Sequence, residues 1–320
     1  MPPELSDLTD QVTSLTPDQY IGIPIALVGA VFLALGTQFQ HRGVTKVEDN
    51  LGSGAKAGLS VRQLTALLGR PSWVIGTLML GAAIVLQLLS LKFAPLIVVQ
   101  PLGAVALVVT AIVNSRISKV KLTRQAIRAI VFSVGGVTLF VAFAAPFAKS
   151  SPIEASQLAT VLILLAIVLV IFAVIFVTLR KKFKAVFYIL GAGVLFGFVA
   201  TLAKTVIDRI TTITMAGFEP DSFEWLTLLC VVALLAASAL GSYFVQSAHS
   251  HGPPDLVVAG LTVIDPLVAV TIGIVVLNEM AGAPLWTMFA LLIAGGIAIY
   301  GVFLLSRVHV PTPEETKPVA

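Results

Sequence analysis

The sequence predicts an all-α, polytopic membrane protein with about nine transmembrane helices in two inverted repeats. Three observations lead to this fold class. Hydrophobic residues make up 58% of the chain and charged residues only 11%, with a mean hydropathy of +1.02, which is outside the range of soluble globular proteins. The apolar stretches are about 20 residues long, which suits helices that cross a bilayer. One motif also returns in a later stretch.

The predicted spans follow from these apolar stretches. None alternates strictly between apolar and polar residues, as the strands of a membrane barrel do. They cover about 21–40, 72–91, 93–114, 126–147, 157–179, 185–206, 223–247, 256–277 and 285–306. We divide the chain into an external N-terminal segment, 1–20, a first repeat of four helices, 21–150, a second repeat of five helices, 151–306, and a disordered cytoplasmic tail, 307–320.

The basic residues indicate the orientation of the spans. Sixteen of the twenty Lys and Arg lie around the loops that follow the first, third and fifth spans or in the tail, whereas Lys92, Lys149 and Arg209 lie on the opposite side. Cytoplasmic loops carry the excess of basic residues. We therefore predict a multi-pass plasma-membrane protein with its N-terminus outside and its C-terminus in the cytoplasm. The net charge of +4 reflects this topology, and no nucleic-acid partner is expected.

The repeated motif suggests a duplication. VVQPLGAV, from Val98 to Val105, returns as VIDPLVAV, from Val263 to Val270, at an offset of 165 residues. Near the first span the offset is 164 and pairs Gln40 with Lys204. The third span runs inward and the eighth runs outward, so the repeats have opposed orientations. Inverted repeats of this kind are typical of secondary transporters, which expose one central site to each side in turn.

Each copy of the motif places a polar residue before a proline at the centre of a span. These residues are Gln100 before Pro101 and Asp265 before Pro266. Proline lacks an amide hydrogen and displaces the carbonyl four residues earlier, so both spans are predicted to kink mid-membrane. The kinks are either structural, with neighbouring helices satisfying the freed carbonyls, or they line a substrate site.

Asp265 is the carboxylate that the sequence places nearest the bilayer midplane. A bare aspartate there costs about 2.5 to 3.5 kcal/mol on insertion scales. It is therefore protonated and hydrogen-bonded to a neighbouring helix, paired with a cation, or a ligand of a transported cation. Asp265 is our one candidate metal ligand.

Three further polar residues are candidates for the substrate path. Lys204 falls toward the outer end of the sixth span, where it either snorkels to the interface or faces inward and neutralises Asp265 or Glu279. Glu279 follows the eighth span and is either interfacial or part of the path. Gln40, at the end of the first span, belongs to the polar inventory of a lumen.

No motif indicates an enzyme or a cofactor. The chain has no G-x-x-x-x-G-K-[ST] and no H-E-x-x-H, so neither nucleotide-driven pumping nor a recognisable hydrolase is predicted. The alternative outside transport is a membrane enzyme or scaffold. Its candidate residues are His249 and His251, which with Asp255 could ligate a transition metal, although a solvated turn explains them better.

The residues resemble the drug/metabolite transporter superfamily, and in particular its NIPA-like magnesium transporter branch. The resemblance is carried by TQFQHRGV after the first span, by VVQPLGAV and by the two glycines at 135 and 136. Pro101, Leu102 and Gly103 match the branch's PLG motif, Lys204 a lysine of the sixth span, and Asp265 with Pro266 the polar residue and proline of the eighth. The segment from Asn114 to Lys119 has no acidic residue where members often carry glutamate.

The resemblance implies a secondary transporter, with magnesium or another divalent cation as its substrate. The alternative is a carrier of a small organic metabolite or lipid-linked intermediate, coupled to protons. The expected partners are the small-molecule or ion substrate and the lipid bilayer, and a homodimer is left open. The predicted substrate-binding residues are Gln100, Pro101, Gly103, Asp265, Pro266, Lys204, Gln40 and Glu279.

Overall fold

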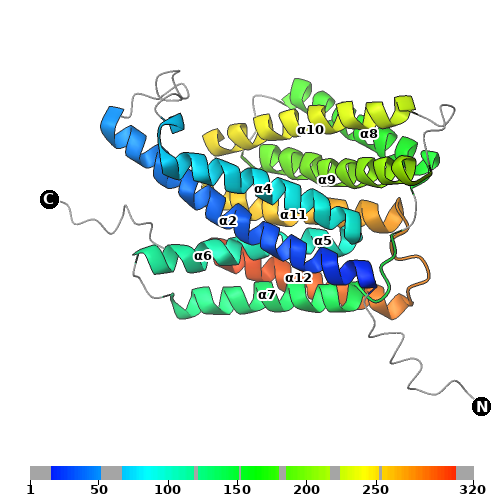
Figure 1. Cartoon of the computed structure of the whole chain (residues 1–320), viewed down its shortest axis with the longest axis horizontal. Helices are drawn as coiled ribbons and strands as arrows, with labels where there is room; N and C mark the ends of the chain where they lie inside the picture. The colour runs from blue at the N-terminus through cyan, green and yellow to red at the C-terminus, as the bar shows by residue number, and fades with distance from the viewer. Residues whose placement is uncertain are drawn as a thin grey trace, which may run out of the picture.

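The structure is a computed structural model that describes residues 16–51, 67–118, 122–150, 153–179, 185–216, 224–251 and 254–307. Its regular elements in these ranges are all helices (Figure 1). They are α2 (Pro17–Leu51), α4 (Pro71–Phe93), α5 (Leu96–Leu102), α6 (Val105–Ser118), α7 (Arg124–Ala144), α8 (Ala155–Leu179), α9 (Ala185–Ala216), α10 (Glu224–His251), α11 (Pro254–Val275) and α12 (Leu285–Arg307).

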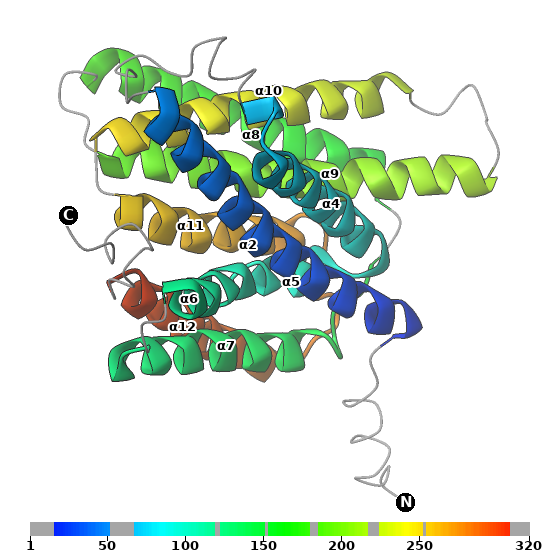
Figure 2. The ribbon, with the colours of Figure 1, turned by 60° about the vertical axis from the view of Figure 1, so that its left-hand side comes forward.

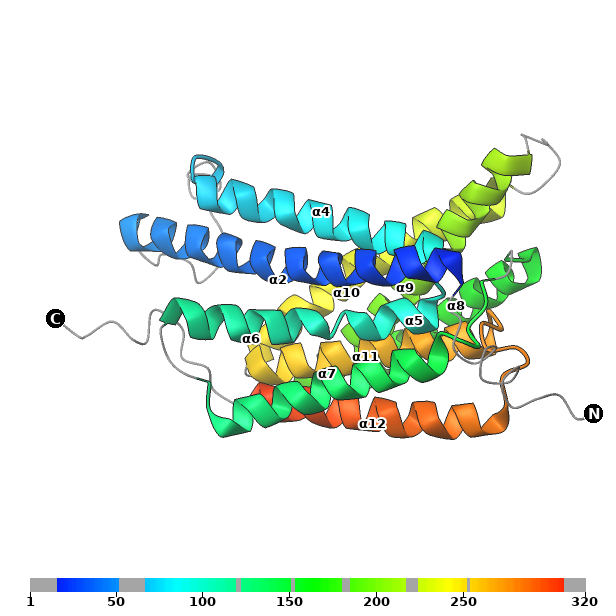
Figure 3. The ribbon, with the colours of Figure 1, turned by 60° about the horizontal axis from the view of Figure 1, so that its bottom comes forward.

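Nine helical segments in the described residues are long and apolar enough to cross a membrane, which confirms the predicted fold class. The third of these spans, Leu96–Ile117, consists of α5 and α6 laid end to end (Figure 3). The first helix is longer than predicted at both ends. The predicted external segment and tail lie almost entirely outside the described residues, and the division into repeats at residue 150 stays a prediction.

Equivalent helices of the two repeats run in opposite directions. In Figure 1, α2 runs from right to left and α9 from left to right, and the same opposition relates α4 to α10, the α5–α6 pair to α11, and α7 to α12. The packing follows the same pattern, because α2 contacts α4 as α9 contacts α10. Across the repeats, α7 contacts α12 and α5 contacts α11. The arrangement is that of an inverted repeat.

Glycines allow the closest helix contacts. In α2, Gly22, Gly29, Gly36 and Gly43 recur every seven residues, and each faces α4 or the residue just after it. A Cβ at Gly36 would lie 3.0 Å from the Gly76 carbonyl oxygen, so the two backbones nearly touch. Small residues at such contacts let transmembrane helices pack by van der Waals contact, which is the main attraction available between helices in lipid.

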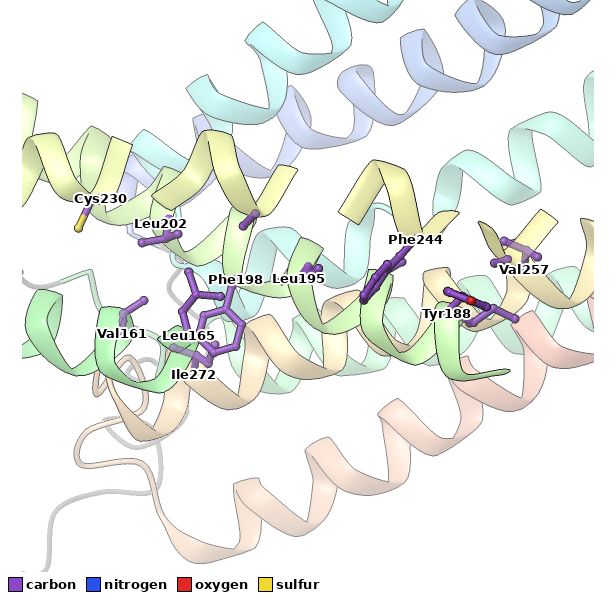
Figure 4. Close-up of a cluster of buried hydrophobic side chains, with 14 of the residues drawn as sticks. Val161, Leu165, Tyr188, Leu195, Phe198, Leu202, Cys230, Phe244, Val257 and Ile272 are labelled. Carbon is purple, nitrogen blue, oxygen red and sulfur yellow. The ribbon is translucent and has the colours of Figure 1, made fainter. Parts of the chain in front are cut away.

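The largest apolar cluster lies in the second repeat. Side chains from α8, α9, α10 and α11 form it, including Leu165, Leu195, Phe198 and Phe244 (Figure 4). Figure 2 shows α8, α9 and α10 together on one side, α7 and α12 on the other, and α5 and α11 between them. The two motif-bearing segments therefore lie at the centre of the molecule.

The two motifs differ in local structure. After Pro101 the helix stops, and hydrogen bonds of the i to i−3 type carry the chain through Gly103 and Ala104. By contrast, α11 continues through Pro266 without interruption. The residue equivalent to Gly103 is Val268, whose side chain packs onto Gly197 of α9. The helix is therefore interrupted after Pro101 and continuous through Pro266, and the kink predicted at each proline stays a prediction.

Candidate functional site

The two motif prolines line one cavity. Pro101 and Pro266 face it from α5 and α11, and α7 and α12 complete the wall with residues such as Phe140 and Ala298. The lining is almost entirely apolar. Thr262 is its one polar side chain, and its hydroxyl donates to the Val258 carbonyl oxygen at 2.8 Å. The cavity therefore lies where the sequence predicts a central site, but its surface suits an apolar group.

Asp265 lies beside this cavity and not on its wall. It sits where α11 crosses α9, and its backbone oxygen would be 3.0 Å from a Cβ at Gly197. The Asp265 Oδ1 atom is buried without a hydrogen-bond partner. A buried carboxylate oxygen without a partner is costly, because it has lost its water and gained nothing in return. The Asp265 carboxylate therefore has a buried oxygen that a proton or a cation would satisfy.

Gln100 and Gly103 flank Pro101 closely in the first motif. Gln100 is buried at 6% exposure, and its backbone oxygen accepts from the Gly103 amide at 3.2 Å. Gly103 ends α5 with a right-handed helical backbone, so its φ angle does not require glycine. Gln40 lies elsewhere, near the end of the bundle opposite the start of α2, where its Nε2 donates to Thr77 Oγ1 at 3.0 Å.

Glu279 is buried and has a defined structural partner. Its Oε1 accepts from the Leu96 amide at 2.7 Å and its Oε2 from the Ile97 amide at 2.8 Å, so the carboxylate caps the N-terminus of α5. Asn278 has φ 56°, and this left-handed turn directs Glu279 back over the end of α11. A Cβ at Gly273 would lie 2.9 Å from Oε2, so glycine makes room for the carboxylate.

Lys204 is buried as well and does not snorkel to the interface. Its ammonium donates to the Leu91 carbonyl oxygen at 2.7 Å and to Ser150 Oγ at 3.2 Å. It also pairs with Asp208 Oδ1 at 3.2 Å, one turn along α9. The sequence reasoning missed Asp208, although the spacing of a lysine and an aspartate four residues apart in one span was a readable signal.

The histidine hypothesis gains no support from the local geometry. His249 and His251 lie in the last turn of α10, two residues apart, so they point to different sides of the helix. His251 Nδ1 lies 2.7 Å from the Ser247 carbonyl oxygen, and its ring packs on Tyr188. The Asp255 side chain lies outside the described residues. In the described part of the chain, no three His, Cys, Asp or Glu residues cluster as a metal site would require.

The buried carboxyl group of Glu279 predicts how the stability of the fold depends on pH. Burial raises its pKa from the ordinary 4.5 to about 7, against the opposing effects of the two amide bonds and the charge of Lys204; the Asp208 charge acts with burial. The folded protein therefore binds this proton more tightly than the unfolded chain. The stability from Glu279 is fully present below pH 4.5 and is lost as the pH rises through about 7.

We expect the wild type to lose at most about 1.4 kcal/mol per pH unit in this window relative to Glu279→Gln. Thermal unfolding in detergent, followed by tryptophan fluorescence, measures the difference. Glu154→Gln, at an exposed carboxylate, is the matched control and should follow the wild type. Parallel stability curves for the wild type and Glu279→Gln would contradict the prediction.

Comparisons with known proteins identify the family of the chain. The family model of the magnesium transporter NIPA matches residues 17–310. An uncharacterized protein of Corynebacterium glutamicum is 26% identical over 287 residues, which cover 90% of this chain and 95% of that protein. The nine spans and this match define a multi-pass membrane transporter of the drug/metabolite transporter type. The chain belongs to the NIPA magnesium transporter family.

Proposed function

We propose that the protein transports Mg²⁺ by alternating access and that Asp265 is its main protein ligand. The observation that carries the proposal is the buried Oδ1 of Asp265, which has no hydrogen-bond partner and lies beside the paired prolines. Mg²⁺ dehydrates reluctantly and is commonly held by one or two carboxylates while it keeps several waters. A single aspartate between two repeats satisfies this requirement.

The neighbouring residues have supporting roles in this proposal. Gln100 supplies a polar side chain at the equivalent position of the first motif, and the helix break after Pro101 at Gly103 allows α5 and α6 to move separately. Pro266 leaves the Thr262 carbonyl without its usual amide donor, so a second oxygen is available close to Asp265. The other candidates lie nearer the ends of the bundle. Lys204 and Glu279 are at the end where α2 begins, and Gln40 is toward the opposite end.

The charge distribution supports an orientation in the plasma membrane. The end of the bundle that holds the start of α2 carries few basic residues, so we place it outside, with the C-terminus in the cytoplasm. Many helix faces carry exposed apolar side chains, which suits contact with lipid. The proposal applies equally to a monomer and to a homodimer.

The apolar cavity favours a second candidate, a proton-coupled transporter of a small organic metabolite or lipid-linked intermediate. Its lining offers little to a hydrated divalent cation but would accommodate an apolar group. In that case the carboxyl of Asp265 would carry the coupling proton. No observation favours an enzyme or a scaffold.

A flux measurement separates the two candidates. The purified protein is reconstituted into proteoliposomes that contain a fluorescent Mg²⁺ indicator, and uptake is compared with that of protein-free vesicles. We expect Mg²⁺ uptake that saturates with concentration and that other divalent cations compete for. Absence of Mg²⁺ flux, together with counterflow of an organic compound from a metabolite panel, would exclude magnesium as the substrate.

A further inference from the structure

Two buried charges hold one turn of the first repeat. The turn joins α4 to α5 at Ala94 and Pro95. On its α4 side the ammonium of Lys204 binds the Leu91 carbonyl oxygen, and on its α5 side the carboxylate of Glu279 binds the amides of Leu96 and Ile97. Both charged residues belong to the second repeat, so these bonds join the two halves. We call Lys204, Asp208 and Glu279 the inter-repeat clamp.

The surroundings make these bonds strong. The Lys204 side chain is 2% exposed and Glu279 is 3% exposed, so water does not compete for either group. Hydrogen bonds to charged groups are about twice as strong as neutral ones. Lys204→Met leaves the carboxylate of Asp208 without its cation, and Glu279→Gln turns a side-chain amide nitrogen toward one of the two backbone amides, so each change weakens the closed arrangement. Opening the turn toward water, in contrast, hydrates every member of the clamp.

The opposite end of the molecule has no charged counterpart at the equivalent positions. The offset of 164 residues relates Lys204 and Asp208 to Gln40 and Val44, and the offset of 165 relates Glu279 to Asn114. None of these three is charged. Gln40 donates to Thr77 of α4, so this bond stays inside the first repeat. The duplication has therefore kept the fold symmetric while the two ends differ in charge.

We infer that Lys204 and Glu279 form the gate at the end of the bundle where α2 begins, and that this gate is closed in the resting state. The inference rests on the alternating access proposed above. The turn between α4 and α5 must move for Asp265 to be reached from this side, and the movement breaks both sets of bonds. At the equivalent positions of the other end the residues are neutral, so we expect the resting transporter to open more readily there.

The test measures access to the centre of the molecule. Cys230, the one cysteine of the chain, is replaced by serine, and Ala104→Cys places a reporter thiol on the cavity wall. Reconstituted protein is treated with a membrane-impermeant maleimide from one side at a time. Glu279→Gln and Lys204→Met are compared with the parent. We expect both to speed labelling from the clamp side by at least about tenfold, while labelling from the other side does not rise.

Controls separate gating from general loosening. Asn114→Ala, the equivalent position at the other end, should not change labelling from the clamp side. Glu279→Asp keeps the charge with a shorter reach and should give an intermediate rate. Unchanged labelling in both Glu279→Gln and Lys204→Met, or an equal rise from both sides, would overturn the gate. Labelling requires no substrate, so a gate without Mg²⁺ flux, or Mg²⁺ flux without a gate, would show which proposal fails.

Discussion

Asp265→Asn is expected to reduce Mg²⁺ uptake into proteoliposomes by at least about tenfold, a loss of about 1.4 kcal/mol or more of binding free energy. Asparagine has nearly the same shape as aspartate but no negative charge. It can offer one carbonyl oxygen to the ion, and it brings two amide hydrogens that a cation repels. The fold should survive, because the Oδ1 atom has no hydrogen-bond partner to lose.

The controls for this prediction concern charge and fold. Glu154→Gln removes a carboxylate that is exposed at one end of the bundle and should leave uptake unchanged. The unfolding temperature of Asp265→Asn should equal or exceed that of the wild type, because an uncompensated buried charge has been removed. Normal uptake by the folded variant would exclude Asp265 as the ion ligand.

Gly136→Ala and Gly301→Ala are expected to lower the unfolding temperature by at least about 5 °C each. A Cβ at Gly136 would fall against the backbone nitrogen of Ala298, and one at Gly301 against that of Ser133, both closer than 3.0 Å. Backbone atoms cannot rotate away as a side chain can. The helices α7 and α12 would have to separate along their length, and the contacts on both sides would be lost.

Adjacent glycines provide matched controls. Gly135 and Gly296 have no atom within 4 Å of a Cβ position. Alanine favours a helix over glycine by about 1 kcal/mol, so Gly135→Ala and Gly296→Ala should leave stability unchanged or raise it slightly. Tryptophan fluorescence during heating in detergent measures all four variants. Equal effects at Gly135 and Gly136 would contradict the packing described for α7 and α12.

The nine spans and the inverted arrangement could be predicted from the sequence, because each depends on a local property. A span follows from an apolar stretch of sufficient length, and the duplication follows from VVQPLGAV and VIDPLVAV. The meeting of Pro101 and Pro266 at one cavity follows in turn from the duplication, since equivalent positions of two repeats lie near the axis that relates them.

The roles of Glu279 and Lys204 could not be predicted in the same way. Glu279 caps a helix that begins 183 residues earlier in the chain, and no local pattern joins the two. One indirect signal exists, since α5 begins after Pro95 without a side chain of its own to cap it. The apolar lining of the cavity could not be predicted from the sequence either, because it depends on which faces of α7 and α12 turn inward.

The row of glycines on α2 bears on how the molecule changes shape. Helices in contact through their backbones cannot rotate against each other without steric collision or loss of attraction, so α2 and α4 should travel together as one rigid lever. The flexible joint is then the short stretch at Gly103 and Ala104, where the chain has no regular helix. A small displacement of the α2–α4 pair at the membrane surface would then become a rotation of α5 against α6 at the centre of the molecule.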